Sequence, residues 1–221
     1  MRYQNTYDTN GNLTHSIDLF YNSTSEYKYN QNNQLIELKE NNTLLIVYTY
    51  NENKLIESEL IYRIYPDEDK ENSLLDSTSY SYYDNGLLSQ KIKKNILHEF
   101  TYNKKGKLIN RKKLFDNQII FYEDFIYDKF GRETDYINSN GQWHKQTYLH
   151  SSTQNSKFDF MKKTSYENSS GYKEKRSYDS NGYQNSFYYK INDKIWWDKH
   201  ILNDNGDILY YENSDGHIVK N

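Results

Sequence analysis

The segment that decides the fold is Phe100-Thr101-Tyr102-Asn103-Lys104-Lys105-Gly106-Lys107-Leu108. Its two aromatic residues stand at alternate positions, which a β-strand places on one face. The Asn103 side chain can accept a hydrogen bond from the main chain two residues further on, and Gly106 can take the positive φ that closes a turn. The segment therefore predicts a strand, a hairpin turn and the start of the next strand.

The same pattern recurs along the chain. An aromatic-x-Tyr-Asx sequence also occurs at 27–30, 48–51 and 125–128. Eight of the nine glycines follow Asn or Asp by three positions, and Gly86 follows Asp84 by two. The tyrosines that precede these turns are Tyr7, Tyr29, Tyr50, Tyr82, Tyr102 and Tyr127. Their spacing indicates a period of about 21 residues, which corresponds to two strands and two turns.

Further turn signals stand where glycine is missing. Asparagine, which tolerates left-handed geometry, takes its place in Asn30-Gln31-Asn32-Asn33 and in Asn51-Glu52-Asn53. Tighter turns are expected at Asn41-Asn42, Lys94-Asn95, Asp116-Asn117 and Asn192-Asp193. We therefore expect an all-β fold, a single domain over residues 1–221, built as an antiparallel meander of about 16–19 strands. Because long sheets twist, we expect a curled or nearly closed sheet.

Composition supports a thin fold. The 221 residues include 25 tyrosines, no alanine and a single proline, and the mean hydropathy is -1.12. Tyrosine can bury its ring while its hydroxyl stays in water, so aromatic faces can replace a large apolar core. The net charge is -3, there is no cysteine, and no apolar run is long enough for a membrane helix or a signal peptide. We expect a cytoplasmic protein without disulfides or a membrane partner.

One repeat resembles a known family. Tyr127-Asp128-Lys129-Phe130-Gly131-Arg132 is similar to the YD repeat of RHS proteins, which reads Tyr-Asp-x-x-Gly-Arg with a period near twenty. The stretches 7–11 and 178–182 share its first five positions. The resemblance implies strands of the kind that spiral into a shell around a toxic cargo domain in much longer proteins. It also implies a link to bacterial toxin systems.

Motifs for catalysis are missing from the sequence. The six histidines show no paired metal-ligand spacing, no Gly-x-x-x-x-Gly-Lys precedes a helix, and no Gly-x-Ser-x-Gly elbow occurs. We therefore predict no enzyme activity, no metal and no cofactor.

Two charged stretches are candidates for binding. Asp67, Glu68 and Asp69 form an acidic loop, which is either a solvated hairpin or an acidic plug for a basic cleft. Residues 91–113 carry nine basic residues against one acid, but an acid-rich segment precedes them. Cross-strand pairing of these two stretches is therefore a better explanation than nucleic-acid binding.

Adjacent aromatic residues are the most informative surface feature. They occur at 82–83, 188–189, 196–197 and 210–211. Consecutive residues of a strand point to opposite faces, so each doublet places one ring on each side of the sheet. Together with Trp143, such rings could bind a protein or a sugar, unless the curl of the sheet covers both faces.

These features predict a non-catalytic protein-binding module, specifically an immunity protein that neutralises a bacterial toxin by binding it. The candidate partner-binding residues are Trp143, Trp196, Trp197, Tyr188, Tyr189, Asp67, Glu68 and Asp69. One alternative is a carbohydrate-binding or cell-surface repeat fragment, for which the partner is a glycan. Another is a structural segment of a longer repeat protein.

Overall fold

The computed structural model describes residues 2–65, 70–149, 162–178, 183–203 and 205–220, which form 19 β-strands and no helix. The strands are β1 (Tyr3–Tyr7), β2 (Leu13–Asp18), β3 (Ser23–Tyr29), β4 (Leu35–Glu40), β5 (Leu44–Tyr50), β6 (Ile56–Arg63), β7 (Ser73–Tyr82), β8 (Leu88–Lys93), β9 (Ile96–Tyr102), β10 (Leu108–Phe115), β11 (Gln118–Tyr127), β12 (Glu133–Asn138), β13 (Trp143–Tyr148), β14 (Lys163–Asn168), β15 (Lys173–Tyr178), β16 (Gln184–Ile191), β17 (Lys194–Leu202), β18 (Ile208–Asn213) and β19 (Ile218–Lys220). The predicted all-β class and strand number are confirmed.

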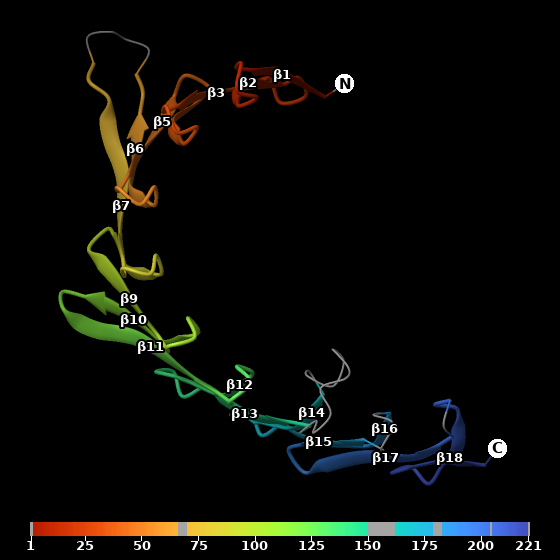
Figure 1. Ribbon diagram of the computed structural model, residues 1–221. Coiled ribbons are helices and arrows are strands. Elements are labelled where there is room, and N and C mark those ends of the chain that lie inside the picture. Colours follow the sequence, from red (N-terminus) through yellow and green to blue (C-terminus); the bar gives the residue numbers. More distant parts are fainter. Residues whose placement is uncertain (1, 66–69, 150–161, 179–182, 204, 221) are drawn as a thin grey trace. The chain divides into compact units, whose positions relative to one another are not determined.

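The strands form an antiparallel meander that divides into two compact units. The first unit comprises residues 1–101 and 112–120, and the second comprises residues 102–111 and 121–221. Within the first unit β1 to β9 pair in sequence order, and within the second β11 to β19 do the same. Each unit is a single layer of strands (Figure 1). No described pairing joins the first strand of a unit to its last, so neither unit closes into a barrel.

Most turns of the repeat are built around one Asx side chain. The turn after Tyr82 differs, because Tyr83 takes the Asx position and its carbonyl accepts the N–H of Gly86. Asp8 Oδ1 accepts hydrogen bonds from the main-chain N–H groups of Asn10 and Asn12, each 2.9 Å away. The N–H of Gly11 donates to the Asp8 carbonyl, and Gly11 has a φ of 84°. Corresponding side-chain bonds form at Asn30, Asn51, Asn103, Asp128, Asn138, Asn168, Asn203 and Asn213. A single acceptor oxygen therefore organises these nine turns, and either Asp or Asn can supply it.

The residue four positions after the Asx often completes the turn. When the Asx is Asp8 or Asp128, the later residue donates: Asn12 Nδ2 lies 2.9 Å from Asp8, and Arg132 Nε lies 2.7 Å from Asp128. When the Asx is asparagine, its amide donates instead. Asn30, Asn138 and Asn203 bond to acceptors on Gln34, Gln142 and Asp207.

The glycine-free turns follow the expectation in part. Asn33 has a φ of 58°, as predicted, whereas the left-handed residue of the next such turn is Lys54 (φ 64°) and not Asn53. The prediction for Asn53 was wrong because this turn keeps the spacing of the others, in which the fourth residue carries the positive φ. The tight turns are confirmed, with positive φ at Asn41, Asn42, Lys94, Asn95, Asp116, Asn117 and Asn192. The turn at 179–182 lies outside the described residues.

The repeated tyrosines tie neighbouring repeats together. In five of them the hydroxyl donates to a main-chain carbonyl at the start of the preceding strand, over 2.6–3.0 Å. The pairs are Tyr29 with Leu13, Tyr50 with Leu35, Tyr82 with Ile56, Tyr127 with Leu108, and Tyr178 with Lys163. The ring packs on the sheet and the hydroxyl satisfies a strand-end carbonyl, which explains why tyrosine recurs at this position.

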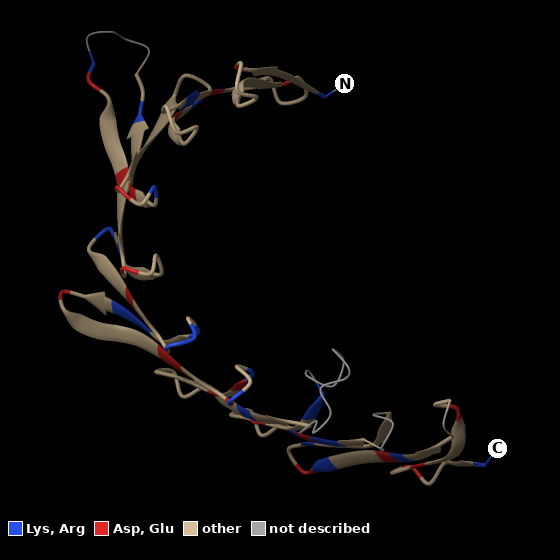
Figure 2. Ribbon diagram, viewed as in Figure 1, with Lys and Arg blue, Asp and Glu red and all other residues tan. Residues whose placement is uncertain are grey.

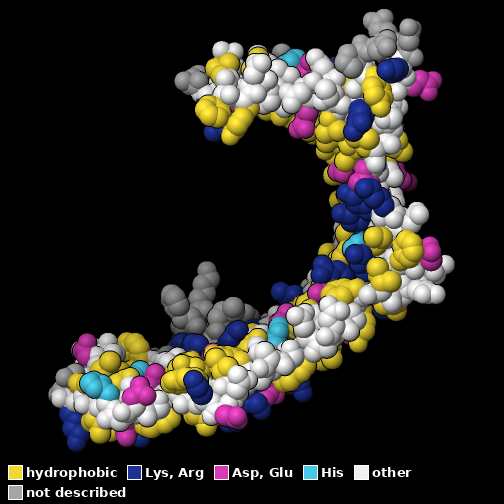
Figure 3. Space-filling view, turned by 180° about the vertical axis from the view of Figure 1, so that it is seen from behind, with side chains coloured by type: hydrophobic (Ala, Val, Ile, Leu, Met, Phe, Trp, Pro, Cys, Tyr) yellow, Lys and Arg dark blue, Asp and Glu magenta, His cyan; other side chains and the backbone are white. Residues whose placement is uncertain are grey.

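The layer has no apolar core. None of the described hydrophobic residues is buried, and hydrophobic side chains alternate with polar ones on the face shown in Figure 3. Charges of both signs are spread over both units (Figure 2). The predicted cross-strand pairing of the acidic and basic stretches is confirmed at Lys93, whose Nζ lies 3.0 Å from Asp76 Oδ2.

The second unit has two different faces. On the first, the aromatic face, rings form a continuous row with centroid separations of 4.8–6.3 Å. The row consists of Phe125, Tyr136, His144, Tyr166, Tyr172, Tyr189 and Trp196. The second, the polar face, carries charged and hydroxyl side chains from the alternate positions of the same strands.

Candidate functional site

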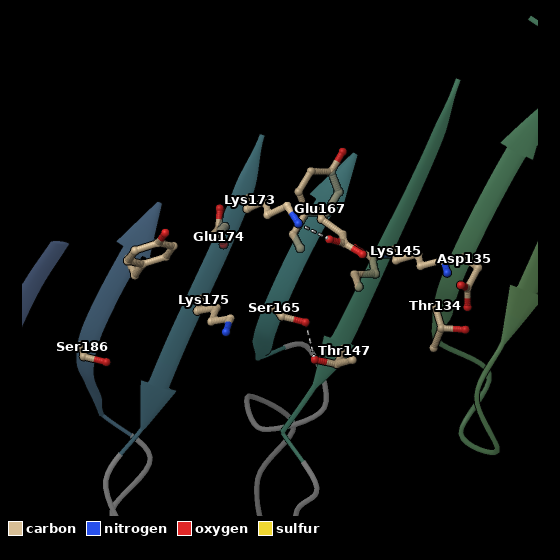
Figure 4. A pocket seen from close by; sticks show the side chains of 13 residues that line it. Thr134, Asp135, Lys145, Thr147, Ser165, Glu167, Lys173, Glu174, Lys175 and Ser186 are labelled. Carbon is tan, nitrogen blue, oxygen red and sulfur yellow. Dashed lines mark hydrogen bonds and ion pairs between the residues drawn. The ribbon is translucent and has the colours of Figure 1, made fainter. Parts of the chain in front are cut away.

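The polar face of the second unit contains a hollow of about 900 Å³. Side chains from β12, β13, β14, β15 and β16 line it (Figure 4). The strands are adjacent and in register, so directly paired residues stand next to one another on this face. The site is therefore a set of rows that run across the strands.

One row alternates in charge. Asp135 pairs with Lys145, Lys145 with Glu167, and Glu167 with Lys173. Neighbouring strands lie about 4.8 Å apart, so the sign changes at that interval. Lys173 Nζ lies 3.2 Å from Glu167 Oε2, with 58% and 38% of the two side chains exposed. Ion pairs this exposed contribute little to stability, so these groups remain available to a partner.

The next row carries hydroxyl groups. Thr147 pairs with Ser165, and their hydroxyl oxygens lie 2.7 Å apart. Ser165 pairs in turn with Lys175, and Lys175 with Tyr188. Hydroxyl groups can donate and accept, so this row can bond to groups of either kind.

Aromatic side chains stand at the end of the hydroxyl row. Tyr188 lines the main hollow and pairs with Trp197, which is 37% exposed. Both also line a smaller hollow of about 380 Å³. Trp143 lines a separate hollow of about 460 Å³ with Ile126 and Ile137. The polar face therefore offers rings on either side of its charged centre.

The structure divides the residues predicted to bind a partner. Trp143, Tyr188 and Trp197 lie on the polar face, whereas Tyr189 and Trp196 lie on the aromatic face, where their rings stack with centroids 4.8 Å apart. The two rings of the doublet 188–189, and those of the doublet 196–197, thus point to opposite faces, as predicted. Asp67, Glu68 and Asp69 lie outside the described residues.

The alternating charged row was not predicted. Its members come from four strands, and the sequence separations between them are unequal because the intervening turns differ in length. Only the register brings them together. No motif along the chain marks this row, because its members meet only across the strands.

Two histidines lie near carboxylates on the aromatic face. His144 Nε2 lies 2.6 Å from Glu133 Oε1, and His200 Nε2 lies 3.8 Å from Asp198 Oδ1. Within the described part of the chain, no group of three or more His, Asp or Glu side chains is arranged to hold a metal ion. Among the same residues, no helix is long and apolar enough to cross a membrane.

Comparison with known proteins relates this sheet to solved structures. No family model and no curated protein sequence matches the chain. The structure of TcdB2-TccC3 without its hypervariable C-terminal region is similar over 90% of the chain, with a TM-score of 0.59 and 12% identity. TcdB2-TccC3-TEV is similar over 96%, with a TM-score of 0.53 and 11% identity.

These similarities establish the fold. The chain spans 12% of the length of each of these two TcdB2-TccC3 chains. TccC3 is also named in a structure of the Photorhabdus luminescens Tc holotoxin pore, which is a weaker match with a TM-score of 0.38. The antiparallel meander described here thus resembles a segment of these TcdB2-TccC3 chains.

Proposed function

We propose that the chain is a non-catalytic protein-binding module of a bacterial toxin system, and specifically an immunity protein that binds and neutralises a toxin in the cytoplasm. The polar face of the second unit is the proposed binding surface. The observation that supports this proposal most strongly is the hollow in which a charged row lies beside a hydroxyl row that ends at the Tyr188–Trp197 pair. The resemblance of the fold to TcdB2-TccC3 supports the link to toxins.

The chemistry of this face suits a protein surface. Its charged row offers both signs at regular intervals, so it can pair with Lys or Arg and with Asp or Glu of a partner. Trp and Tyr are the residues that most often dominate binding energy at interfaces. The rings of Tyr188 and Trp197 lie outside the aromatic row. A partner can therefore cover them without disturbing the stacked rings of that row.

The test is co-purification with the product of a neighbouring toxin-like gene, followed by calorimetry. We expect Trp197→Ala and Tyr188→Ala each to weaken binding at least tenfold, and growth rescue from the toxin to fall accordingly. Tyr3→Ala is the matched control, because Tyr3 is an exposed ring (47%) on β1 in the other unit. Failure of every neighbouring toxin to bind, or equal losses in all three variants, contradicts the proposal.

Binding of a carbohydrate is the second candidate. The exposed Trp197 ring beside hydroxyl and charged groups favours it, because sugars combine apolar ring faces with hydroxyl groups. A glycan array distinguishes the two functions. Specific glycan binding that is lost in Trp197→Ala, without binding to a toxin, supports the carbohydrate function instead.

A further inference from the structure

A second hollow, of about 610 Å³, lies on the aromatic face over β14 and β15. Among the residues that the structure describes, three cationic side chains line it, those of Lys162, Lys163 and Arg176, against the single carboxylate of Glu174. The remaining lining residues are tyrosines. This hollow is separate from the polar face, because Glu174 pairs with Tyr166 of the aromatic row whereas Lys175 pairs with Ser165 of the hydroxyl row.

Aromatic rings position the cations. Lys163 Nζ lies 5.3 Å from the centroid of the Tyr166 ring, and Lys162 Nζ lies 5.6 Å from that of Tyr178. The guanidinium carbon of Arg176 lies 5.1 Å from the centroid of Phe187. Cation–π contacts of this kind orient a cation without neutralising its charge.

Both oxygens of the Glu174 carboxylate already accept a hydrogen bond. Glu174 is 9% exposed, its Oε1 accepts a hydrogen bond from Arg176 Nε at 2.6 Å, and its Oε2 accepts one from the Tyr172 hydroxyl at 2.8 Å. Burial, together with Glu174, raises the pKa of Tyr172 to about 12, so this hydroxyl remains a donor at neutral pH. Glu174 therefore balances the charge of Arg176 and not that of Lys163.

We propose that this hollow binds a phosphate group, with Lys163 and Arg176 as its main ligands. Among the described residues, the hydrogen bond of Arg176 to Glu174 uses Nε, so the two terminal nitrogens can donate to a phosphate. Guanidinium and ammonium groups together bind phosphate oxygens through short, charge-assisted hydrogen bonds. A phosphate monoester carries about -1.5 to -2 at pH 7, which suits several cations better than a single carboxylate does.

The experiment uses the full chain and inorganic phosphate as the probe. Phosphate is titrated at constant ionic strength set with chloride, and binding is followed by amide chemical shifts over β14 and β15 and by the melting temperature. We expect saturable binding that weakens at least tenfold in Lys163→Gln. The backbone carbonyl of Lys163, which accepts the Tyr178 hydroxyl at 2.9 Å, is retained in this variant.

The matched control is Lys175→Gln. It removes the same charge from the next strand, but on the opposite face, and should leave phosphate affinity within twofold. Equal weakening in both variants, or an effect of phosphate no larger than that of chloride, overturns the proposal. A phosphoserine peptide and adenosine monophosphate then identify the source: tighter binding of the peptide supports a phosphorylated protein, and tighter binding of the nucleotide supports a nucleotide ligand.

Discussion

The hydroxyl of Tyr50 donates a hydrogen bond to the main-chain carbonyl oxygen of Leu35, 2.6 Å away. The same bond recurs from Tyr29 to Leu13 and from Tyr82 to Ile56. It explains why the two aromatic positions of the repeat differ. The first position needs only a ring and accepts phenylalanine, whereas the second needs the hydroxyl and is tyrosine.

Removal of this hydroxyl should therefore destabilise the sheet more than removal of a hydroxyl at the first position. Tyr50→Phe leaves a strand-end carbonyl without its donor and should cost about 1 kcal/mol. Tyr27→Phe is the control, because no hydrogen bond of the Tyr27 hydroxyl is found among the described residues. It should change stability by less than about 0.5 kcal/mol. Urea unfolding followed by circular dichroism measures both. Equal losses would show that the carbonyl bond does not distinguish the two positions.

A second prediction concerns the pairing of Asn203 with Asp207, whose Nδ2 and Oδ2 atoms lie 2.9 Å apart. Asn203→Asp places two carboxylates in contact and should cost about 1 kcal/mol at pH 7. Addition of Asp207→Asn creates the same pair that Asp8 and Asn12 form, and should restore most of the lost stability. A double-mutant cycle, with stability measured by urea unfolding, gives the interaction energy between residues 203 and 207. If the losses of the two single variants simply add in the double variant, the two side chains do not act as a pair.

The two neighbouring tryptophans should behave differently because they lie on different faces. Trp196 stacks on Tyr189 within the aromatic row, so Trp196→Ala should cost about 2–3 kcal/mol of unfolding free energy. Trp197 is 37% exposed on the polar face, and Trp197→Ala should cost less than about 1 kcal/mol. Thermal unfolding of both variants tests this, and a larger loss for Trp197 would reverse the assignment of the faces.

Turns and strands could be predicted from the sequence because their causes are local. The bonds within the turn from Asp8 to Asn12 involve residues at most four positions apart, so the Asx-x-x-Gly pattern marks them directly. The face of each ring in a doublet follows from strand alternation alone.

The binding surface depends on register, which the sequence does not reveal. Asp135 and Lys145 are ten positions apart, but Lys145 and Glu167 are 22 apart, and residues 150–161 lie between them. The hollow proposed to bind phosphate also depends on register, because Lys163 and Arg176 come from different strands. Side chains that meet only across a ladder of strands leave no periodic signal along the chain.

Acid should destabilise the protein through carboxylates held ionised in the folded state. Although burial opposes it, hydrogen bonds from the main chain and side chain of Arg132 lower the pKa of Asp128 below its ordinary value. Asp76 also has a lowered pKa, through its hydrogen bond and ion pair with Lys93. A lowered folded pKa means that the stabilisation is present above the unfolded value of about 4 and is lost as pH falls through the folded value.

Unfolding free energy should therefore fall as pH decreases below about 4, with protons taken up on unfolding. Asp128→Asn should weaken this dependence, because it removes one of the titrating groups. At pH 7 it should also cost about 2 kcal/mol, because it replaces the charge-assisted bonds at 2.7 Å from Arg132 Nε and Nη2. Urea unfolding from pH 7 to pH 2.5 tests both effects. An unchanged acid dependence in Asp128→Asn would show that the Asp128–Arg132 turn does not contribute to acid sensitivity.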